Sequence, residues 1–265
     1  MEIENLVIER KGHMATIVFD RFEKRNSLSP RMLIGIFLTL RDFAKANDVW
    51  VVVFRGAGDK AFSSGYDISV IPTEVTREAQ EELRNKNPLE LCLDSVKNYP
   101  FPTIAMLNGY AFGAGFNLAM CCDIRIAADD VRMGLPPARL GLVYHIEGLK
   151  QVMDALGTSR AKEVLMTARN YEGAELKEMG IVDHLVPRAE LEPYTYKLAE
   201  EIAANAPLSL KGMKRIVNMF SDAVRLAPEQ VREAEGFIRE AFNSADLKEG
   251  QMAFLQKRKP NFTGK

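Results

Sequence analysis

Asn108-Gly-Tyr-Ala-Phe-Gly-Ala-Gly-Phe-Asn-Leu-Ala119 decides the fold, because it combines a short strand, a glycine turn and the start of a helix. The upstream segment Phe62-Ser-Ser-Gly-Tyr-Asp-Ile68 has the same order. Glycines at such a junction permit positive φ angles and close approach of a ligand, and the first amides of a helix have no intrahelical acceptor. Two such amides that converge on one oxygen atom make an oxyanion hole.

The composition is that of an ordinary globular protein. The chain has 265 residues with 47% hydrophobic content, enough to bury a substantial core. Its 35 basic and 36 acidic residues nearly cancel, so no overall charge favours nucleic acid or an anionic membrane. Three cysteines without a Cys-x-x-Cys spacing, and only three histidines, argue against a disulfide framework and a metal site. No apolar run approaches the roughly 20 residues of a membrane span, so we expect a cytoplasmic protein with buried cysteines.

The first third of the chain predicts strands and one clear helix. Two β-rich runs, residues 6–10 and 14–19, flank Lys11-Gly12-His13 and predict a hairpin. Ser29-Pro30, followed by apolar residues at spacings of three and four, predicts a helix with a serine N-cap. The continuous apolar run of residues 50–54 is typical of a parallel strand covered on both faces.

The rest of the chain completes an α/β architecture. Residues 103–107 and 123–127 predict further strands and hence a βαβ wind. From residue 146 onward we expect helices, at residues 148–156, 159–168, 173–179, 191–205, 208–222 and 229–244. We expect residues 1–200 to form a spiral β/α core that holds the site and residues 201–265 to form a helical C-terminal region.

The glycine motifs, with Val51-Val-Val-Phe-Arg-Gly-Ala-Gly-Asp-Lys-Ala-Phe62 before them and Cys122-Asp-Ile-Arg-Ile-Ala127 after them, carry a family resemblance. The sequence resembles the crotonase (enoyl-CoA hydratase/isomerase) superfamily over nearly its whole length. Within it, three segments are similar to the methylmalonyl-CoA decarboxylase group: Ser63-Ser-Gly-Tyr-Asp-Ile68, Leu140-Gly-Leu-Val-Tyr-His-Ile-Glu-Gly148 and the segment from Glu249 to Phe262. The resemblance implies an α/β crotonase (ClpP-like) fold, a spiral of ββα units followed by a helical C-terminal trimerisation region. It also implies a homo-trimer or a hexamer of two trimers.

The resemblance assigns the oxyanion hole to the backbone N–H groups of Tyr66 and Ala114. A thioester carbonyl that becomes an enolate gains negative charge on oxygen, and two fixed donors stabilise that charge. The hydratases of the family use two glutamates as acid and base, and those positions hold Asn117 and Pro137 here. Proline cannot transfer a proton and asparagine can only orient one, so hydration lacks its usual machinery. Asn117 is expected to face the pocket, with a purely structural place in the helix as the alternative.

Tyr144 matches the tyrosine that the decarboxylase group places against the substrate carboxylate. A phenol can hydrogen-bond a carboxylate, and loss of CO₂ requires orientation and oxyanion stabilisation but no general base. We therefore expect decarboxylation of a malonyl or methylmalonyl type CoA ester, with a core tyrosine as the alternative for Tyr144. His145 is expected to be structural, because adjacent side chains of an extended chain point apart. Tyr66 departs from the histidine of the related decarboxylases, and its side chain is expected to line or cap the acyl pocket.

Coenzyme A is expected as part of the thioester substrate, without a permanently bound cofactor. Cations suit its phosphates and a flat aromatic ring suits its base or pantetheine arm. The positions that match the family's CoA-binding residues are Lys24, Arg25, Ser64, Asp67, Ile68, Phe254 and Lys257.

Two other functions remain open at this point. The first is an enoyl-CoA hydratase or isomerase in which Asp67, Glu90 or Glu147 supplies the acid and base. The second is a crotonase without catalysis that only binds CoA esters or a partner. Release of CO₂ measured against addition of water would separate the three.

Overall fold

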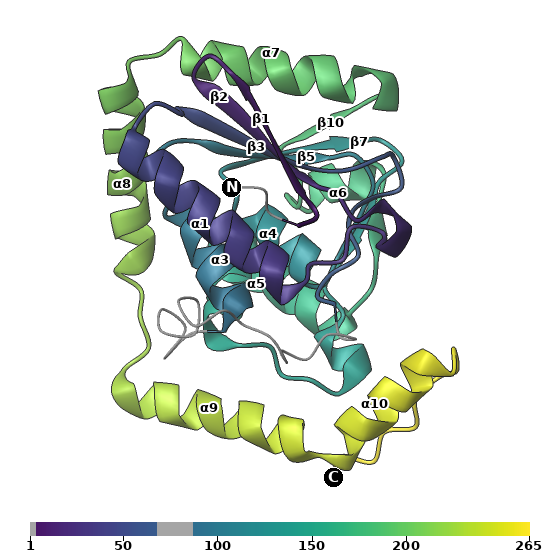
Figure 1. Cartoon of the computed structure of the whole chain (residues 1–265). Helices are drawn as coiled ribbons and strands as arrows, with labels where there is room; N and C mark the ends of the chain where they lie inside the picture. The colour runs from purple at the N-terminus through teal and green to yellow at the C-terminus, as the bar shows by residue number, and fades with distance from the viewer. Residues whose placement is uncertain (1–3, 68–86) are drawn as a thin grey trace.

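The computed structural model describes residues 4–67 and 87–265 (Figure 1). Its larger sheet has six strands in the order β1-β2-β3-β5-β7-β10. The hairpin of β1 and β2 is antiparallel, with Lys11 opposite Met14 and Gly12 at φ +57° in the turn, and the other neighbours run parallel. The bounds are β1 Leu6–Lys11, β2 Met14–Phe19, β3 Val51–Gly56, β5 Thr103–Leu107, β7 Ile124–Ala128 and β10 His184–Val186.

The smaller sheet has four short strands in the order β4-β6-β8-β9. The first three run parallel, and β9 is antiparallel to β8. β4 and β6 are the strands that enter the two glycine turns, so their pairing places the turns side by side. The bounds are β4 Ala61–Ser63, β6 Tyr110–Phe112, β8 Arg132–Gly134 and β9 Tyr171–Glu172.

Helices cover both faces of the larger sheet. α7 (Leu191–Ala203) lies across one face, and α1 (Pro30–Ala46), α3 (Pro88–Lys97), α4 (Ala114–Cys121) and α5 (Ile146–Thr167) lie on the other side (Figure 1). The predicted N-cap of α1 is confirmed, since the hydroxyl of Ser29 accepts the N–H of Met32 at 3.2 Å.

Three helices at the C-terminal end wrap around the outside. α8 (Pro207–Asp222) runs along one side, and α9 (Pro228–Asn243) and α10 (Ala245–Leu255) lie at the far end from α7 (Figure 1). Neither α8 nor α9 has a buried residue. The predicted boundary at residue 200 falls near the end of α7, and a division into two units stays a prediction. The short elements are η1 (Phe22–Lys24), η2 (Pro137–Leu140), α6 (Ala174–Glu178) and η3 (Arg188–Glu190).

The helices match the sequence pattern with two differences. The two helices expected between residues 148 and 168 are confirmed: they share the label α5 and are separated at Gly157, whose φ of 75° and ψ of 162° are not helical. The sequence did not predict α3 or α10. The three cysteines are free and buried, as expected. In the described residues, no helix has the length and apolar character needed to cross a membrane.

Candidate active site

The two glycine turns lie against each other. Ser63 of β4 stands opposite Ala111 of β6. A Cβ atom on Gly65 would lie 2.9 Å from the carbonyl oxygen of Phe112 and 3.6 Å from the nitrogen of Ala114. Gly65 also has a φ of +106°, which residues with a side chain rarely adopt. Only glycine therefore allows the two backbones to approach this closely.

The backbone N–H groups of Tyr66 and Ala114 have no acceptor among the described residues. Leu28 forms a parallel bridge to Tyr66, donating to the carbonyl of Gly65 at 2.8 Å and accepting the N–H of Asp67 at 2.9 Å. The polar groups of successive residues in extended chain point to opposite sides, so the N–H of Tyr66 points away from Leu28. Ala114 is the first residue of α4, where no intrahelical acceptor exists. Both N–H groups are thus available to a ligand.

Ser63 and Gly115 fix these amides in place. The hydroxyl of Ser63 is buried and accepts the N–H of Gly65 at 3.1 Å. A Cβ atom on Gly115 would lie 2.7 Å from the carbonyl oxygen of Ser63, so the first turn of α4 packs directly on the end of β4. This packing holds the N–H of Ala114 at a fixed position relative to the glycine turn that follows β4.

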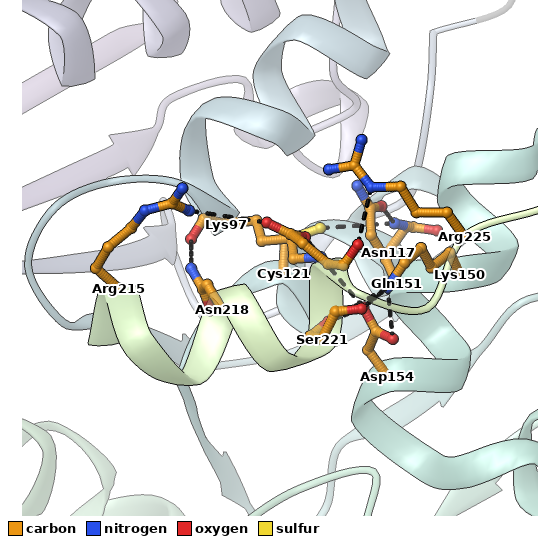
Figure 2. Close-up of polar contacts among 11 residues, drawn as sticks. Lys97, Asn117, Cys121, Lys150, Gln151, Asp154, Arg215, Asn218, Ser221 and Arg225 are labelled. Carbon is orange, nitrogen blue, oxygen red and sulfur yellow. Dashed lines mark hydrogen bonds and ion pairs between the residues drawn. The ribbon is translucent and has the colours of Figure 1, made fainter. Parts of the chain in front are cut away.

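Asn117, on α4, is fully buried. Its Nδ2 donates to Oε1 of Gln151 on α5 at 2.5 Å and lies 3.7 Å from the sulfur of Cys121 (Figure 2). Its Oδ1 is buried and has no hydrogen-bond partner in the described structure. Gln151 is 4% exposed, and the sequence analysis does not predict it as a residue of the site. Its helical spacing from Gly148 was the only signal that could have placed it on the buried face of α5.

A network of charged side chains beside Gln151 ties α3, α5 and α8 together (Figure 2). Oδ2 of Asp154 lies 2.7 Å from Nζ of Lys150 and 3.1 Å from Nζ of Lys97. The same oxygen accepts a hydrogen bond from the hydroxyl of Ser221 at 2.6 Å. Burial raises the pKa of Asp154, but the hydrogen bonds from Lys150, Ser221 and Lys97 outweigh it and lower the pKa below its usual value. The network therefore holds α8 against the helix that carries Gln151.

Tyr144 and His145 lie together, with ring centroids 4.6 Å apart. A Cβ atom on Gly148 would lie 2.4 Å from Cε1 of Tyr144 and 2.6 Å from Nε2 of His145, so both rings cover the first turn of α5. The expectation that the two side chains point apart is wrong. His145 is the N-cap of α5, and strand alternation ends where the helix begins.

The hydroxyl of Tyr144 is buried and has no hydrogen-bond partner among the described residues. Burial, with a smaller contribution from Cys121, raises the pKa of the phenol well above its usual range. The sulfur of Cys121 lies 3.7 Å from Nδ2 of Asn117. A protonated phenol in this place can donate one hydrogen bond to a ligand.

His145 has a similar unpaired atom. Its Nδ1 accepts the N–H of Gly148 at 3.1 Å, and its Nε2 is buried without a partner in the described residues. Burial lowers the pKa of His145 and outweighs the carboxylates of Glu90, Glu147 and Asp94, which raise it. The nearest of these is Glu90, with Oε1 3.8 Å from Nδ1. The neutral ring then carries its proton on Nε2.

Three acids could replace the family glutamates, and they differ in burial and in their neighbours: Asp67, Glu90 and Glu147. Asp67 is buried in an ion pair with Arg21 at 2.8 Å. Glu147 is exposed on the first turn of α5. Glu90 lies beside His145. Pro137 is buried at the start of η2, where no proton can be exchanged. Among the three acids, Glu90 places its Oε1 3.8 Å from Nδ1 of the His145 ring.

The residues expected to hold CoA fall into two groups. Ser64 joins the loop of Lys24 and Arg25, since its N–H donates to the carbonyl of Arg25 at 3.0 Å and its hydroxyl to that of Lys24 at 3.3 Å. All three are exposed. Buried Asn26 fixes the loop by donating to the carbonyl of Ala61 at 2.7 Å. Ile68 lies outside the described residues.

Phe254 lies in the last turn of α10, Lys257 follows the helix by two residues, and both are exposed. α10 packs on η2, because a Cβ atom on Gly250 would lie 2.6 Å from the carbonyl oxygen of Leu140. The role of Phe254 and Lys257 in CoA binding stays a prediction. In the described parts of the chain, no three His, Cys, Asp or Glu side chains gather as metal ligands would.

The half-buried side chain of Tyr66 packs against the core. Burial, and then the charge of Asp67, raises the pKa of its phenol. The phenol is therefore protonated at neutral pH, and its expected place lining or capping the acyl pocket stays a prediction.

Comparison with known proteins identifies the family of this site. The model of the family described as enoyl-CoA hydratase/isomerase matches residues 9–265. The chain is 29% identical over 251 residues to methylmalonyl-CoA decarboxylase of Escherichia coli K12, covering 95% of each chain. It is 32% identical over 267 residues to crotonyl-CoA hydratase of Syntrophomonas wolfei, covering 100% of each. The crystal structure of methylmalonyl-CoA decarboxylase complexed with 2S-carboxypropyl CoA superimposes with a TM-score of 0.89 and 28% identity over 100% of both chains. The chain belongs to the enoyl-CoA hydratase/isomerase family, within the crotonase superfamily.

Proposed function

We propose that this crotonase-superfamily enzyme acts on an acyl-CoA thioester through an enolate and removes CO₂ from a malonyl or methylmalonyl type acyl group. One observation carries the proposal: the N–H groups of Tyr66 and Ala114, which have no acceptor among the described residues, belong to two glycine turns packed against each other. The positions of the two family glutamates are proposed to be those of Asn117 and Pro137. Such a site can stabilise an oxyanion but lacks the acid and base that add water.

The chemistry follows from where charge moves. The thioester oxygen is placed against the N–H groups of Tyr66 and Ala114. The hydroxyl of Tyr144 donates to the carboxylate and holds the C–CO₂ bond perpendicular to the thioester plane. That bond breaks, its electron pair moves to the thioester oxygen, CO₂ leaves, and the α-carbon of the enolate then takes a proton. The two backbone donors stabilise the charge that appears on oxygen more than they stabilise the ground state.

Lys24, Arg25 and Ser64 support the binding of CoA. The loop of Lys24 and Arg25 is exposed, is fixed by the buried hydrogen bond from Asn26 to Ala61, and is hydrogen-bonded to Ser64, two residues before Tyr66. Two cations suit the phosphates of CoA. Asp67 and Ile68 are proposed to border the adenine, and Phe254 and Lys257 to approach from the C-terminal helix.

A hydratase or isomerase is the second candidate. It is favoured by the crotonyl-CoA hydratase relative and by the position of Glu90, whose Oε1 lies 3.8 Å from Nδ1 of His145. In this reading Glu90 would supply the acid and base functions. A crotonase that binds CoA esters without catalysis is the third.

A direct assay separates these functions. The purified protein is given methylmalonyl-CoA and crotonyl-CoA in parallel, with CO₂ release and loss of the enoyl absorbance as readouts. We expect CO₂ from the first substrate and slow hydration of the second. Fast hydration without CO₂ release would support the hydratase, and neither reaction, with measurable CoA-ester binding, would support the third function.

The protein is further proposed to assemble as a homo-trimer or as two trimers. The helices α8 and α9 carry apolar side chains that one copy of the chain leaves uncovered, among them Val217, Phe220, Phe237 and Phe242. Closed cyclic symmetry is the usual way to cover such a surface.

A further inference from the structure

We propose that His145 donates a second hydrogen bond, beside that of Tyr144, to a carboxylate on the acyl group, and so helps to select carboxylated thioesters. The inference rests on the proposed function, because it concerns the acyl end of the same CoA-ester site. It adds to that function a residue that the sequence placed among the structural ones.

The first observation is a pair of unsatisfied atoms. The hydroxyl of Tyr144 and Nε2 of His145 are both buried, and neither has a hydrogen-bond partner in the described structure. Buried polar atoms are almost always paired, so each unpaired one requires an explanation. Both rings lie over Gly148, which has no side chain to separate them. A ligand with two acceptor oxygens, such as a carboxylate, can satisfy both.

The second observation fixes the direction of the hydrogen bond. The cap of α5 uses only Nδ1, which accepts the N–H of Gly148. In the neutral ring the proton is therefore on Nε2, the unpaired atom. A purely structural N-cap needs one acceptor atom and gives no role to a buried N–H on the far side of the ring.

The surrounding charges explain why a neutral donor suits this position. Glu90 and Asp94 on α3 and Glu147 on α5 are the charges that act on His145, and burial outweighs them, so the ring stays neutral. In a decarboxylation, negative charge leaves the carboxylate and appears on the thioester oxygen. Neutral donors orient the carboxylate, whereas a cation would also stabilise the ground-state charge that has to leave. Acidic neighbours disfavour that ground-state charge further.

The test measures binding, so that it does not depend on turnover. The probes are two unreactive thioethers, carboxypropyl-CoA and propyl-CoA, whose dissociation constants are measured by titration calorimetry. Wild-type protein should bind the carboxylated probe about tenfold or more tightly, as a hydrogen bond to a charged group implies. His145→Asn keeps an oxygen for the helix cap but is too short to replace Nε2–H. It should lose most of this preference while its affinity for propyl-CoA stays unchanged.

Two matched variants and one spectroscopic measurement complete the design. His145→Gln, whose longer side chain carries an N–H donor, should recover part of the preference. His184→Asn changes a histidine that contacts Tyr194 on the other side of the sheet, and it should have no effect. If the position 145 variants do not fold, ¹⁵N-histidine spectra of the wild type replace them. The His145 Nε2–H resonance should then shift with carboxypropyl-CoA but not with propyl-CoA.

The outcomes separate this inference from the proposed function. If the wild type prefers the carboxylated probe and His145→Asn keeps the full preference, or the Nε2–H resonance does not move, His145 is only a cap and the inference is wrong. If the wild type has no preference, the malonyl type substrate is wrong and the inference fails with it.

Discussion

Gln151 accepts a hydrogen bond from Asn117 at 2.5 Å, and this bond joins α4 to α5 inside the candidate site (Figure 2). Asn117 is predicted to stand where the family hydratases carry a glutamate. Because its amide hydrogen is directed to Gln151, the remaining Oδ1 is left as a buried acceptor. An amide fixed in this way can orient a ligand but cannot exchange protons with it.

Replacing Gln151 should destabilise the protein. In Gln151→Leu, the Nδ2 group of Asn117 stays buried without its oxygen acceptor, which costs about 1–3 kcal/mol of unfolding free energy. Urea denaturation of the wild type and of Gln151→Leu measures this loss of unfolding free energy. The double variant Asn117→Leu/Gln151→Leu removes both partners and should recover part of the loss. A single variant as stable as the wild type would show that this bond contributes nothing.

Tyr144→Phe should lower turnover and leave the fold intact. The ring that covers α5 is kept, and only the unpaired hydroxyl is lost. A lost hydrogen bond to a charged group predicts a decrease of about 10- to 100-fold in kcat/KM for the carboxylated substrate. Tyr110→Phe, at an exposed tyrosine of β6, is the control. An unchanged rate in Tyr144→Phe would leave Tyr144 as a packing residue.

Docking of α8 should weaken in acid. The pKa of Asp154 is lower in the folded protein than its usual value, because hydrogen bonds from Lys150, Ser221 and Lys97 outweigh its burial. Its contribution to stability is therefore complete above the unfolded pKa of about 4 and is lost as pH falls through the lower folded value. The stability difference between wild type and Asp154→Asn, measured by urea unfolding from pH 7 to pH 2, should shrink only below about pH 4. If the stability difference between wild type and Asp154→Asn stayed constant from pH 7 to pH 2, the ionised carboxylate of Asp154 would not be what stabilises the docking of α8.

Assembly should depend on the apolar faces of α8 and α9. Light scattering should give a molecular mass in solution of three or six times the 29.7 kDa of one chain. Phe220 is 76% exposed, and Phe220→Asp should reduce this mass. Met166, 73% exposed on α5, provides Met166→Asp as a matched control that should leave it unchanged. A wild type with the mass of one chain at micromolar concentration would contradict the assembly.

Much of the fold could be predicted from local patterns. The hairpin at Gly12, the capped start of α1 and the two strand-glycine-helix motifs each rest on residues a few positions apart. The helix α3 was missed because its start, Asn87-Pro88, follows a long segment without strong periodicity. The break in α5 was predicted as a gap between two helices, and Gly157 explains it through its positive φ.

The candidate site could be predicted only in part. The family resemblance pointed to Tyr66, Ala114 and Tyr144, because their neighbours form recognisable motifs. Gln151 could not be predicted, since its contact with Asn117 spans 34 positions and depends on how α5 crosses α4. Strand alternation predicts that the side chains of Tyr144 and His145 point apart, and it does not apply here because His145 caps a helix.

The most direct test of the enolate mechanism compares Ala114→Pro with Ala114→Gly. Proline removes the N–H at the first position of α4, where proline is tolerated, and glycine keeps it. Loss of one oxyanion donor costs about 3–4 kcal/mol of transition-state stabilisation in known enzymes, so decarboxylation by Ala114→Pro should fall by about 10²–10³ while Ala114→Gly loses little. Circular dichroism and the thermal midpoint verify that both variants fold. A folded Ala114→Pro protein with wild-type kcat would mean that this N–H does not polarise the thioester, and the enolate mechanism would be wrong.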